Sequence, residues 1–250
     1  MIDFSAPHIL AISLTFFLAG IVKGVTGMGL PTVAMGVLGA IMPPLGAATL
    51  LIAPSFVTNV WQLFSGPSFI ALASRLWLMM LGIIVGTIAG SRLIANGAAG
   101  WTTIGLGAAL TLYAGLSLLA WRLSVPPRIE RRLSPFIGLA TGIITGGTGV
   151  FVIPAVPYLQ ALGLNREDLI QALGLSFTVS TIALAIGLAG GGAFQLENTG
   201  ASVLAVAPAL LGMWVGQIIR QRVSPVAFRR WFLICLLLLG LQLTLRPLFL

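Results

Sequence analysis

Gly20-Ile-Val-Lys-Gly-Val-Thr-Gly-Met-Gly-Leu-Pro31 is a glycine-rich interruption in an apolar background. It returns in the second half of the chain as Gly142-Ile-Ile-Thr-Gly-Gly-Thr-Gly149. In this match, Gly20, Gly24, Thr26 and Gly27 superpose on Gly142, Gly146, Thr148 and Gly149. A repeat whose two copies are separated by about half the length of a 250-residue chain predicts two structurally similar halves.

The glycine motif is expected to interrupt a helix. Four glycines in ten residues, closed by Pro31, disfavour a continuous helix, because Gly has low helix propensity and Pro removes a hydrogen-bond donor. In a bilayer the freed N–H and C=O groups find no water. An irregular backbone is therefore tolerated only where it is buried in protein or lines a water-filled cavity. Two broken apolar segments at corresponding places in two halves therefore indicate a transporter binding site.

The composition predicts an all-α integral membrane protein. The chain is 58% hydrophobic and 7% charged, whereas soluble domains carry about 25% charged residues. The net charge of +8 comes from arginines between apolar runs, so membrane topology explains it better than nucleic-acid binding does. Cys235 is the single cysteine, which excludes an intramolecular disulfide and a cysteine-based metal site. No cofactor or metal is expected.

Hydrophobic runs divide the chain into ten segments, taking a span as about 20 apolar residues. The first five are about 8–24, 28–42, 46–64, 69–91 and 99–121, and the second five are about 134–147, 149–162, 169–190, 199–219 and 228–246. The first two of each set are short and flank the motif, so each pair is either a re-entrant hairpin or two short spans. We expect a first repeat at 1–123, a cytoplasmic linker at 124–133 and a second repeat at 134–250, sharing one transport core.

Basic residues predict the orientation, because cytoplasmic loops are enriched in Lys and Arg. Of the 13 basic residues, ten fall inside if the Arg122–Arg132 and Arg220–Arg230 clusters are cytoplasmic, while Arg92 and Arg246 fall outside and Lys23 lies within the motif. Both termini are then external. Five segments per half make the two halves inverted repeats. Gly86 in the fourth segment and Gly216 in the ninth belong to small-residue series that predict close helix packing.

An anion inside a membrane protein needs a group of hydrogen-bond donors, which these motifs supply. Backbone N–H groups at a helix start and at glycines can form a concave anion site. The hydroxyls and amide of the third and eighth segments are expected to line the opposite wall, although each could instead hold helices together. The candidate substrate-binding residues are Lys23, Gly24, Thr26, Gly27, Gly29, Ser55, Asn59, Gly146, Gly147, Thr148, Gly149, Ser176 and Ser180.

Two of these candidates have a competing interpretation. Lys23 is the one basic residue assigned to membrane depth, where ionisable side chains usually serve function, but it could also extend to the membrane interface. Thr26 and Thr148 occupy equivalent positions, and either hydroxyl could bond back to its own helix.

The chain resembles the TauE/SafE sulfite exporter family of membrane transporters. The resemblance rests on the repeated glycine motif, each followed by a proline, and on Ile52-Ala-Pro-Ser-Phe-Val-Thr-Asn59 and Gly174-Leu-Ser-Phe-Thr-Val-Ser-Thr181. It covers nearly the whole chain and implies transport of small sulfur-containing anions, such as sulfite or organosulfonates, across the bacterial inner membrane. Lys23 departs from the neutral residue expected in many relatives, and Gly149-Val-Phe151 differs from Gly27-Met-Gly29.

Export by alternating access is the leading hypothesis, and the alternative is export of carboxylates or other non-sulfur anions. The expected partners are a small anion and the lipid bilayer, with no nucleic acid, and the oligomeric state is not predicted. An intramembrane enzyme is disfavoured because the chain has one peripheral histidine and no acidic pair in an apolar segment. A scaffold or assembly subunit is disfavoured because broken helices with paired hydroxyls would lower its stability without serving its function.

Overall fold

The computed structural model describes residues 6–96, 99–119, 124–192 and 196–246, and these residues form eleven helices and no strand. The helices are α1 (Ala6–Thr26), α2 (Leu30–Ile41), α3 (Pro44–Leu63), α4 (Phe69–Asn96), α5 (Ala99–Leu118), α6 (Pro127–Thr148), α7 (Ala155–Ala161), α8 (Arg166–Gly190), α9 (Leu196–Leu204), α10 (Val206–Arg222) and α11 (Pro225–Leu245). The fold class is therefore all-α, as predicted. The positions predicted for both termini and for Arg122 lie outside the described residues.

Seven helical stretches in the described residues are long and apolar enough to cross a membrane: α1, α3, α4, α5, α8, α11 and the stretch formed by α9 and α10. Large apolar side chains such as Leu10, Val85 and Trp214 are exposed on their outer faces. Such contiguous apolar surface is rare on soluble monomers. The protein is therefore a multi-pass membrane protein.

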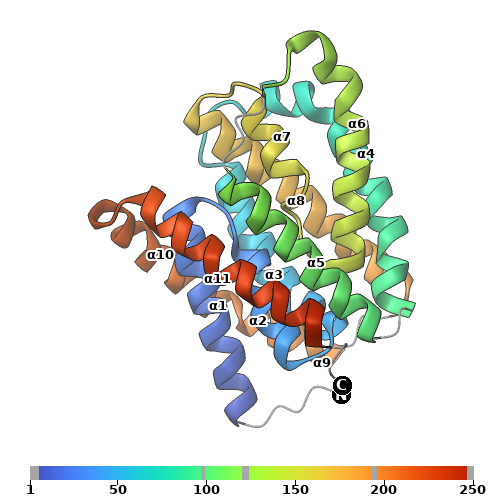
Figure 1. The fold of residues 1–250 in the computed structure, drawn as a ribbon, viewed down its shortest axis with the longest axis vertical. Coiled ribbons are helices and arrows are strands. Elements are labelled where there is room, and N and C mark those ends of the chain that lie inside the picture. Colours follow the sequence, from blue (N-terminus) through green and yellow to red (C-terminus); the bar gives the residue numbers. More distant parts are fainter. Residues whose placement is uncertain (1–5, 97–98, 120–123, 193–195, 247–250) are drawn as a thin grey trace.

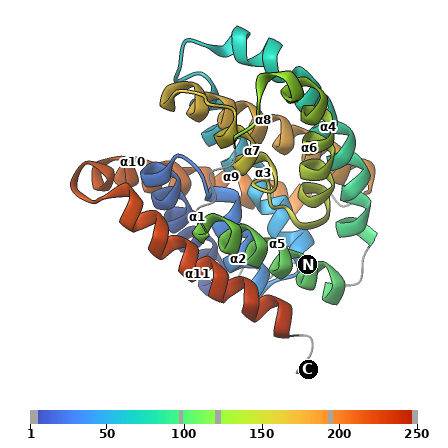
Figure 2. The ribbon, with the colours of Figure 1, turned by 45° about the horizontal axis from the view of Figure 1, so that its top comes forward.

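Helices α3 and α8 lie in the middle of the fold, where they pack against each other (Figures 1 and 2). On one side α1 packs against α10, and on the other α6 packs against α4. Helices α5 and α11 pair with each other and pack on α2. Each of these pairs joins an element of the first half to one of the second.

The glycine motifs interrupt the chain later than the sequence predicts. Helix α1 continues to Thr26 and α6 continues to Thr148, so the first two glycines of each motif are helical. The irregular backbone is confined to 27–29 before α2 and to 149–154 before α7. The prediction that the first segment is short is wrong for the first half, because α1 has 21 residues and is long and apolar enough to span a membrane. Helix α6 has 22 residues, but it begins with a charged turn and is not one of the seven candidate spans in the described residues. The short helices are α2, with 12 residues, and α7, with 7.

Close helix packing explains the helical glycines. A Cβ on Gly24 would lie 2.3 Å from the carbonyl oxygen of Met213 in α10, and a Cβ on Gly142 would lie 2.4 Å from that of Ile83 in α4. Backbones that approach this closely leave no room for a side chain, and close approach is how membrane helices associate through small residues. The predicted packing of the Gly86 and Gly216 series is confirmed, since each glycine faces a backbone carbonyl of the opposite half.

Prolines account for two further differences from the predicted segments. The predicted 199–219 segment is divided into α9 and α10 around Ala205. Pro208 lacks the N–H that would bond to the carbonyl of Leu204, so the helix is interrupted there. Helix α6 begins at Pro127, inside the stretch predicted as a linker, because a proline suits the first turn of a helix.

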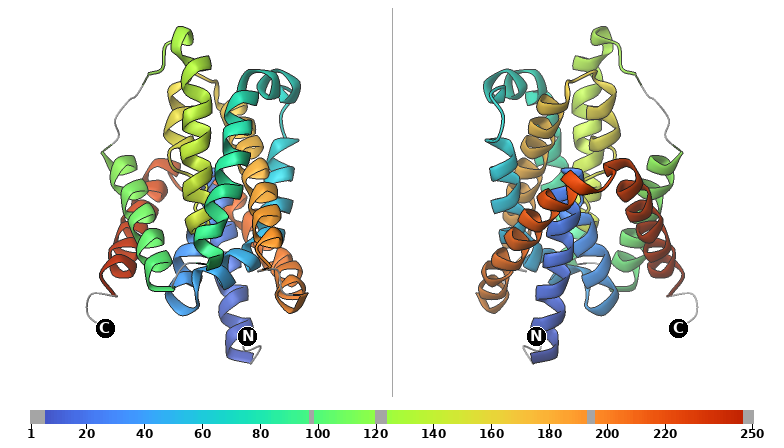
Figure 3. Two further views of the ribbon diagram at one scale, coloured as in Figure 1. Left: turned by 90° about the vertical axis from the view of Figure 1, so that its right-hand side faces the viewer. Right: turned by 90° about the vertical axis from the view of Figure 1, so that its left-hand side faces the viewer.

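Figure 3 shows the first turns of α1 and the last turns of α11 at one end of the molecule, with the first turns of α6 at the other. Helices α1 and α6 thus enter the fold from opposite ends. Their C-terminal ends, which carry the glycine motifs, point toward its middle.

Candidate functional site

The last turn of α1 carries Lys23, whose side chain is buried at 3% exposure. Its Nζ donates to Thr58 Oγ1 at 3.1 Å and to Asn59 Oδ1, both on α3. Both acceptors are neutral, and within the described part of the chain Lys23 forms no ion pair. A buried ammonium without a counter-charge is costly. An ammonium also has three N–H groups, so one remains for a ligand.

Lys23 lines a cavity of about 560 Å³ between α1, α3, α8 and α10. Two further cations, Arg166 and Arg220, line the same cavity, together with the amides of Gln62 and Gln217. No Asp or Glu among the described residues lines it. Arg166 is exposed and Lys23 is buried, so the cavity runs from an accessible basic rim to a buried basic floor. Three like charges around one cavity favour the entry of an anion.

Gln62 connects the end of α1 to α8 at this cavity. Its Nε2 donates to the carbonyl oxygens of Gly27 and Ile170, both at 2.9 Å. Gly27 has φ +78°, a left-handed conformation that suits glycine, and its N–H closes the last turn of α1 on the Lys23 carbonyl at 2.8 Å. Gln62 therefore satisfies a carbonyl that the helix end leaves free.

Thr26 and Thr148 close the two helix breaks in the same way. The Thr26 hydroxyl lies within 2.8 Å of the carbonyl of Val22 and accepts from the Met28 N–H at 3.3 Å. The Thr148 hydroxyl donates to the Ile144 carbonyl at 2.6 Å and accepts from the N–H of the second residue after it at 3.2 Å. The Thr148 hydroxyl bonds back to its own helix, and the Thr26 hydroxyl has the carbonyls of Val22 and Met28 within reach at 2.8 and 2.7 Å, so both hydroxyls are engaged in this conformation.

The other glycines of the predicted site lie away from the Lys23 cavity. A Cβ on Gly146 would meet the carbonyl oxygen of Thr87 at 2.3 Å, and one on Gly147 would lie 3.6 Å from Leu93. Gly29 and Gly149 have φ values of +102° and +70° and allow the turns that lead to α2 and α7. Of the glycines predicted to bind the substrate, the structure thus brings Gly24 and Gly27 to the cavity with Lys23.

The residues of α3 and α8 predicted to bind the substrate, Ser55, Asn59, Ser176 and Ser180, are buried, as a membrane site requires. Asn59 Nδ2 donates to Thr181 Oγ1 at 3.4 Å and so links the two central helices. The hydroxyls of Ser55, Ser176 and Ser180 are fully buried and have no hydrogen-bond partner in the described parts of the chain. Ser55 lies one turn before Asn59 on the same face of α3, next to the residues that contact Lys23. The role predicted for these serines stays a prediction.

The family model for the sulfite exporter TauE/SafE matches residues 12–243. The chain belongs to the TauE/SafE sulfite exporter family. This is a family of membrane transporters that export sulfite and related sulfur-containing anions. Comparisons with curated proteins and with solved structures give no significant match.

In this TauE/SafE member, several cavity residues escaped the sequence analysis. Arg166 and Arg220 counted only as indicators of topology, and Gln62 and Gln217 carried no motif. Their one sequence signal was their position at or near the ends of the predicted segments. The start of α8 and the end of α10 meet only in the folded chain.

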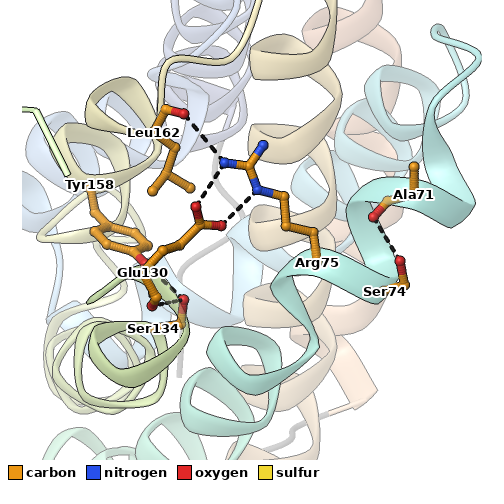
Figure 4. Close-up of polar contacts among 7 residues, drawn as sticks. All are labelled: Ala71, Ser74, Arg75, Glu130, Ser134, Tyr158 and Leu162. Atoms are coloured by element: carbon orange, nitrogen blue, oxygen red, sulfur yellow. Dashed lines mark hydrogen bonds and ion pairs between the residues drawn. The ribbon is translucent and has the colours of Figure 1, made fainter. Parts of the chain in front are cut away.

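A second polar cluster in the TauE/SafE chain is already neutralised. Arg75 at the start of α4 forms a two-point ion pair with Glu130 of α6, with Nε–Oε1 and Nη2–Oε2 distances of 2.7 and 2.8 Å (Figure 4). Arg75 also donates to the carbonyl of Leu162 at 3.3 Å, and Tyr158 donates to the Glu130 carbonyl at 3.1 Å. This cluster joins α4, α6 and α7. Unlike Lys23, its cation has a carboxylate partner.

Proposed function

We propose that this protein exports small sulfur-containing anions, such as sulfite or organosulfonates, across the bacterial inner membrane, and that it binds them in the Lys23 cavity. The observation that carries the proposal is a buried ammonium whose protein partners are two neutral oxygens. A bound anion would supply the missing charge and accept the remaining N–H. Hydrogen bonds between ionised partners are about twice as strong as neutral ones.

The basic rim supports capture of the anion from the cytoplasm. Arg166 and Arg220 line the cavity, and Arg75 reaches the carbonyl of Leu162, four residues before Arg166. Arg75 and Arg166 therefore lie at the same end of the fold, and Arg220 shares a cavity with Arg166. Cytoplasmic loops are enriched in basic residues, so we infer that this end is cytoplasmic, that the termini lie outside, and that this conformation is open to the inside.

We further propose transport by alternating access between two inverted halves. Support comes from the reciprocal packing of α1 on α10 and of α6 on α4, because in each case the first helix of one half packs on the fourth predicted segment of the other. The threonine-closed breaks after α1 and α6 repeat the same local geometry. An inside-negative potential favours outward movement of an anion by about 2.3 kcal/mol per charge per 100 mV, so export could proceed by facilitated diffusion.

Uptake by inside-out vesicles tests the substrate class. Vesicles from cells that make the protein and from matched cells that lack it would be compared with sulfite, sulfoacetate, thiosulfate and simple carboxylates. We expect protein-dependent uptake of the sulfur anions. Uptake of carboxylates alone would replace the sulfur assignment with the alternative substrate class, and no uptake of any anion would overturn the proposed function.

A further inference from the structure

The Gln62 amide has one unused hydrogen-bonding group. Its two N–H groups are occupied by the carbonyls of Gly27 and Ile170 at 2.9 Å each, so the network fixes which end of the amide is nitrogen. The other end, Oε1, is buried and accepts no hydrogen bond from the residues that the structure describes. Buried polar atoms usually have a partner, and an unmade bond is costly.

This amide is part of the wall of the Lys23 cavity. Gln62, Gly27, Ile170 and Lys23 all line it. Because Gly27 and Ile170 hold the amide from two sides, Gln62 cannot turn its nitrogen toward a ligand without breaking both bonds. The residue that holds the unused acceptor and the residue that holds the cationic donor therefore line the same cavity.

We propose that Gln62 makes the site selective for anions that carry a hydrogen-bond donor of their own, such as a protonated oxyanion or a hydroxylated sulfonate. This inference rests on the proposed function. The anionic oxygens of the ligand accept from Lys23, and its O–H donates to Gln62 Oε1. An anion that carries only acceptors would place its lone pairs against those of Oε1. Sites built to bond a ligand hydroxyl discriminate strongly against analogues that lack it.

A matched ligand pair tests the proposal at constant pH and salt. Ethanesulfonate and 2-hydroxyethanesulfonate have the same charge and head group and differ by one hydroxyl. Equilibrium binding of both to the purified wild-type protein should favour the hydroxylated ligand by at least about tenfold, because the ligand without the hydroxyl leaves the buried Oε1 acceptor unpaired. Equal affinity for the two ligands would overturn the proposal.

Two variants distinguish the contribution of Gln62 to selectivity from that of the other cavity residues. In Gln62→Met the preference should fall to about one, whereas a purely structural role would lower both affinities and leave their ratio unchanged. In Lys23→Gln both ligands should bind more weakly with the preference retained, because the hydroxyl still meets Oε1. If Gln62→Met does not fold, the wild-type ratio alone decides.

The same data test the role of Gln62 and the proposed function separately. If the wild type binds both sulfonates equally, the role of Gln62 is wrong and the proposed function stands. If it binds neither sulfonate, and no other sulfur anion, the proposed function itself fails.

Discussion

Replacing Lys23 with Gln should weaken anion binding without weakening the fold. The Nζ of Lys23 donates to Thr58 and Asn59, and a glutamine amide can still donate to the Asn59 oxygen. What is lost is the charge and the N–H that faces the ligand. A hydrogen bond to a charged group contributes about 1.5–3 kcal/mol, so Kd should rise by about 10- to 150-fold. The apo protein should unfold at the same temperature or higher, because an uncompensated buried charge has been removed.

The assay is equilibrium binding of the tightest anion to purified wild type, Lys23→Gln and Lys23→Arg at constant salt, with thermal unfolding of each with and without ligand. Lys23→Arg keeps the charge and should retain part of the affinity with altered selectivity. Ligand raises wild-type stability by RT ln(1 + [L]/Kd), and Lys23→Gln should lose most of that increase. If Lys23→Gln binds within about twofold of wild type, which is under 0.5 kcal/mol, the lysine does not hold the anion and the reasoning is refuted.

Three further predictions concern the fold. Gly24→Ala should cost about 3 kcal/mol of unfolding free energy because its Cβ would meet an α10 carbonyl, and Gly27→Ala about 1 kcal/mol from backbone strain alone; equal losses in thermal unfolding would contradict this packing. Ser202→Ala should lower the unfolding free energy by about 1–3 kcal/mol. Ser202 donates at 2.9 Å to the carbonyl of Leu50, which has no helical partner because Pro54 lacks an N–H. In a Pro54→Ala background the loss caused by Ser202→Ala should be smaller, because the restored N–H of residue 54 bonds to the Leu50 carbonyl. An unchanged loss would show that Ser202 does not supply the hydrogen bond that Pro54 removes. A phosphatase fused to the C-terminus should be active in the periplasm while one fused at Arg128 is silent, and the reverse pattern would contradict the orientation.

The sequence was sufficient to predict the class, the family and the burial of Lys23. Low charge and long apolar runs leave a membrane protein as the consistent solution, and the repeated motif carries the family resemblance. The helix breaks were predicted too early in the motif, because the prediction used the low helix propensity of glycine and did not include the helices that pack on it. Gly24 and Gly142 stay helical because each allows another helix to approach closely, and that tertiary packing outweighs local propensity.

The cavity could be predicted only in part. Lys23 was singled out by its charge at membrane depth, which is a local property. Arg166 and Arg220 reach the cavity because the start of α8 and the end of α10 converge beside the end of α1, and no sequence pattern specifies that convergence. Gln62 was interpreted from the sequence as a helix-interface residue and not as a site residue, because its significance lies in the atoms that hold its nitrogen, the carbonyls of Gly27 and Ile170.

Transport by the reconstituted protein shows directly whether it exports a sulfur-containing anion. The purified protein would be placed in liposomes loaded with the best sulfur anion of the vesicle panel, and efflux would be followed while a potassium gradient with valinomycin sets the membrane potential. We expect efflux well above that of protein-free liposomes, accelerated by an inside-negative potential and strongly reduced in Lys23→Gln. Efflux equal to that of protein-free liposomes at every potential would contradict this expectation.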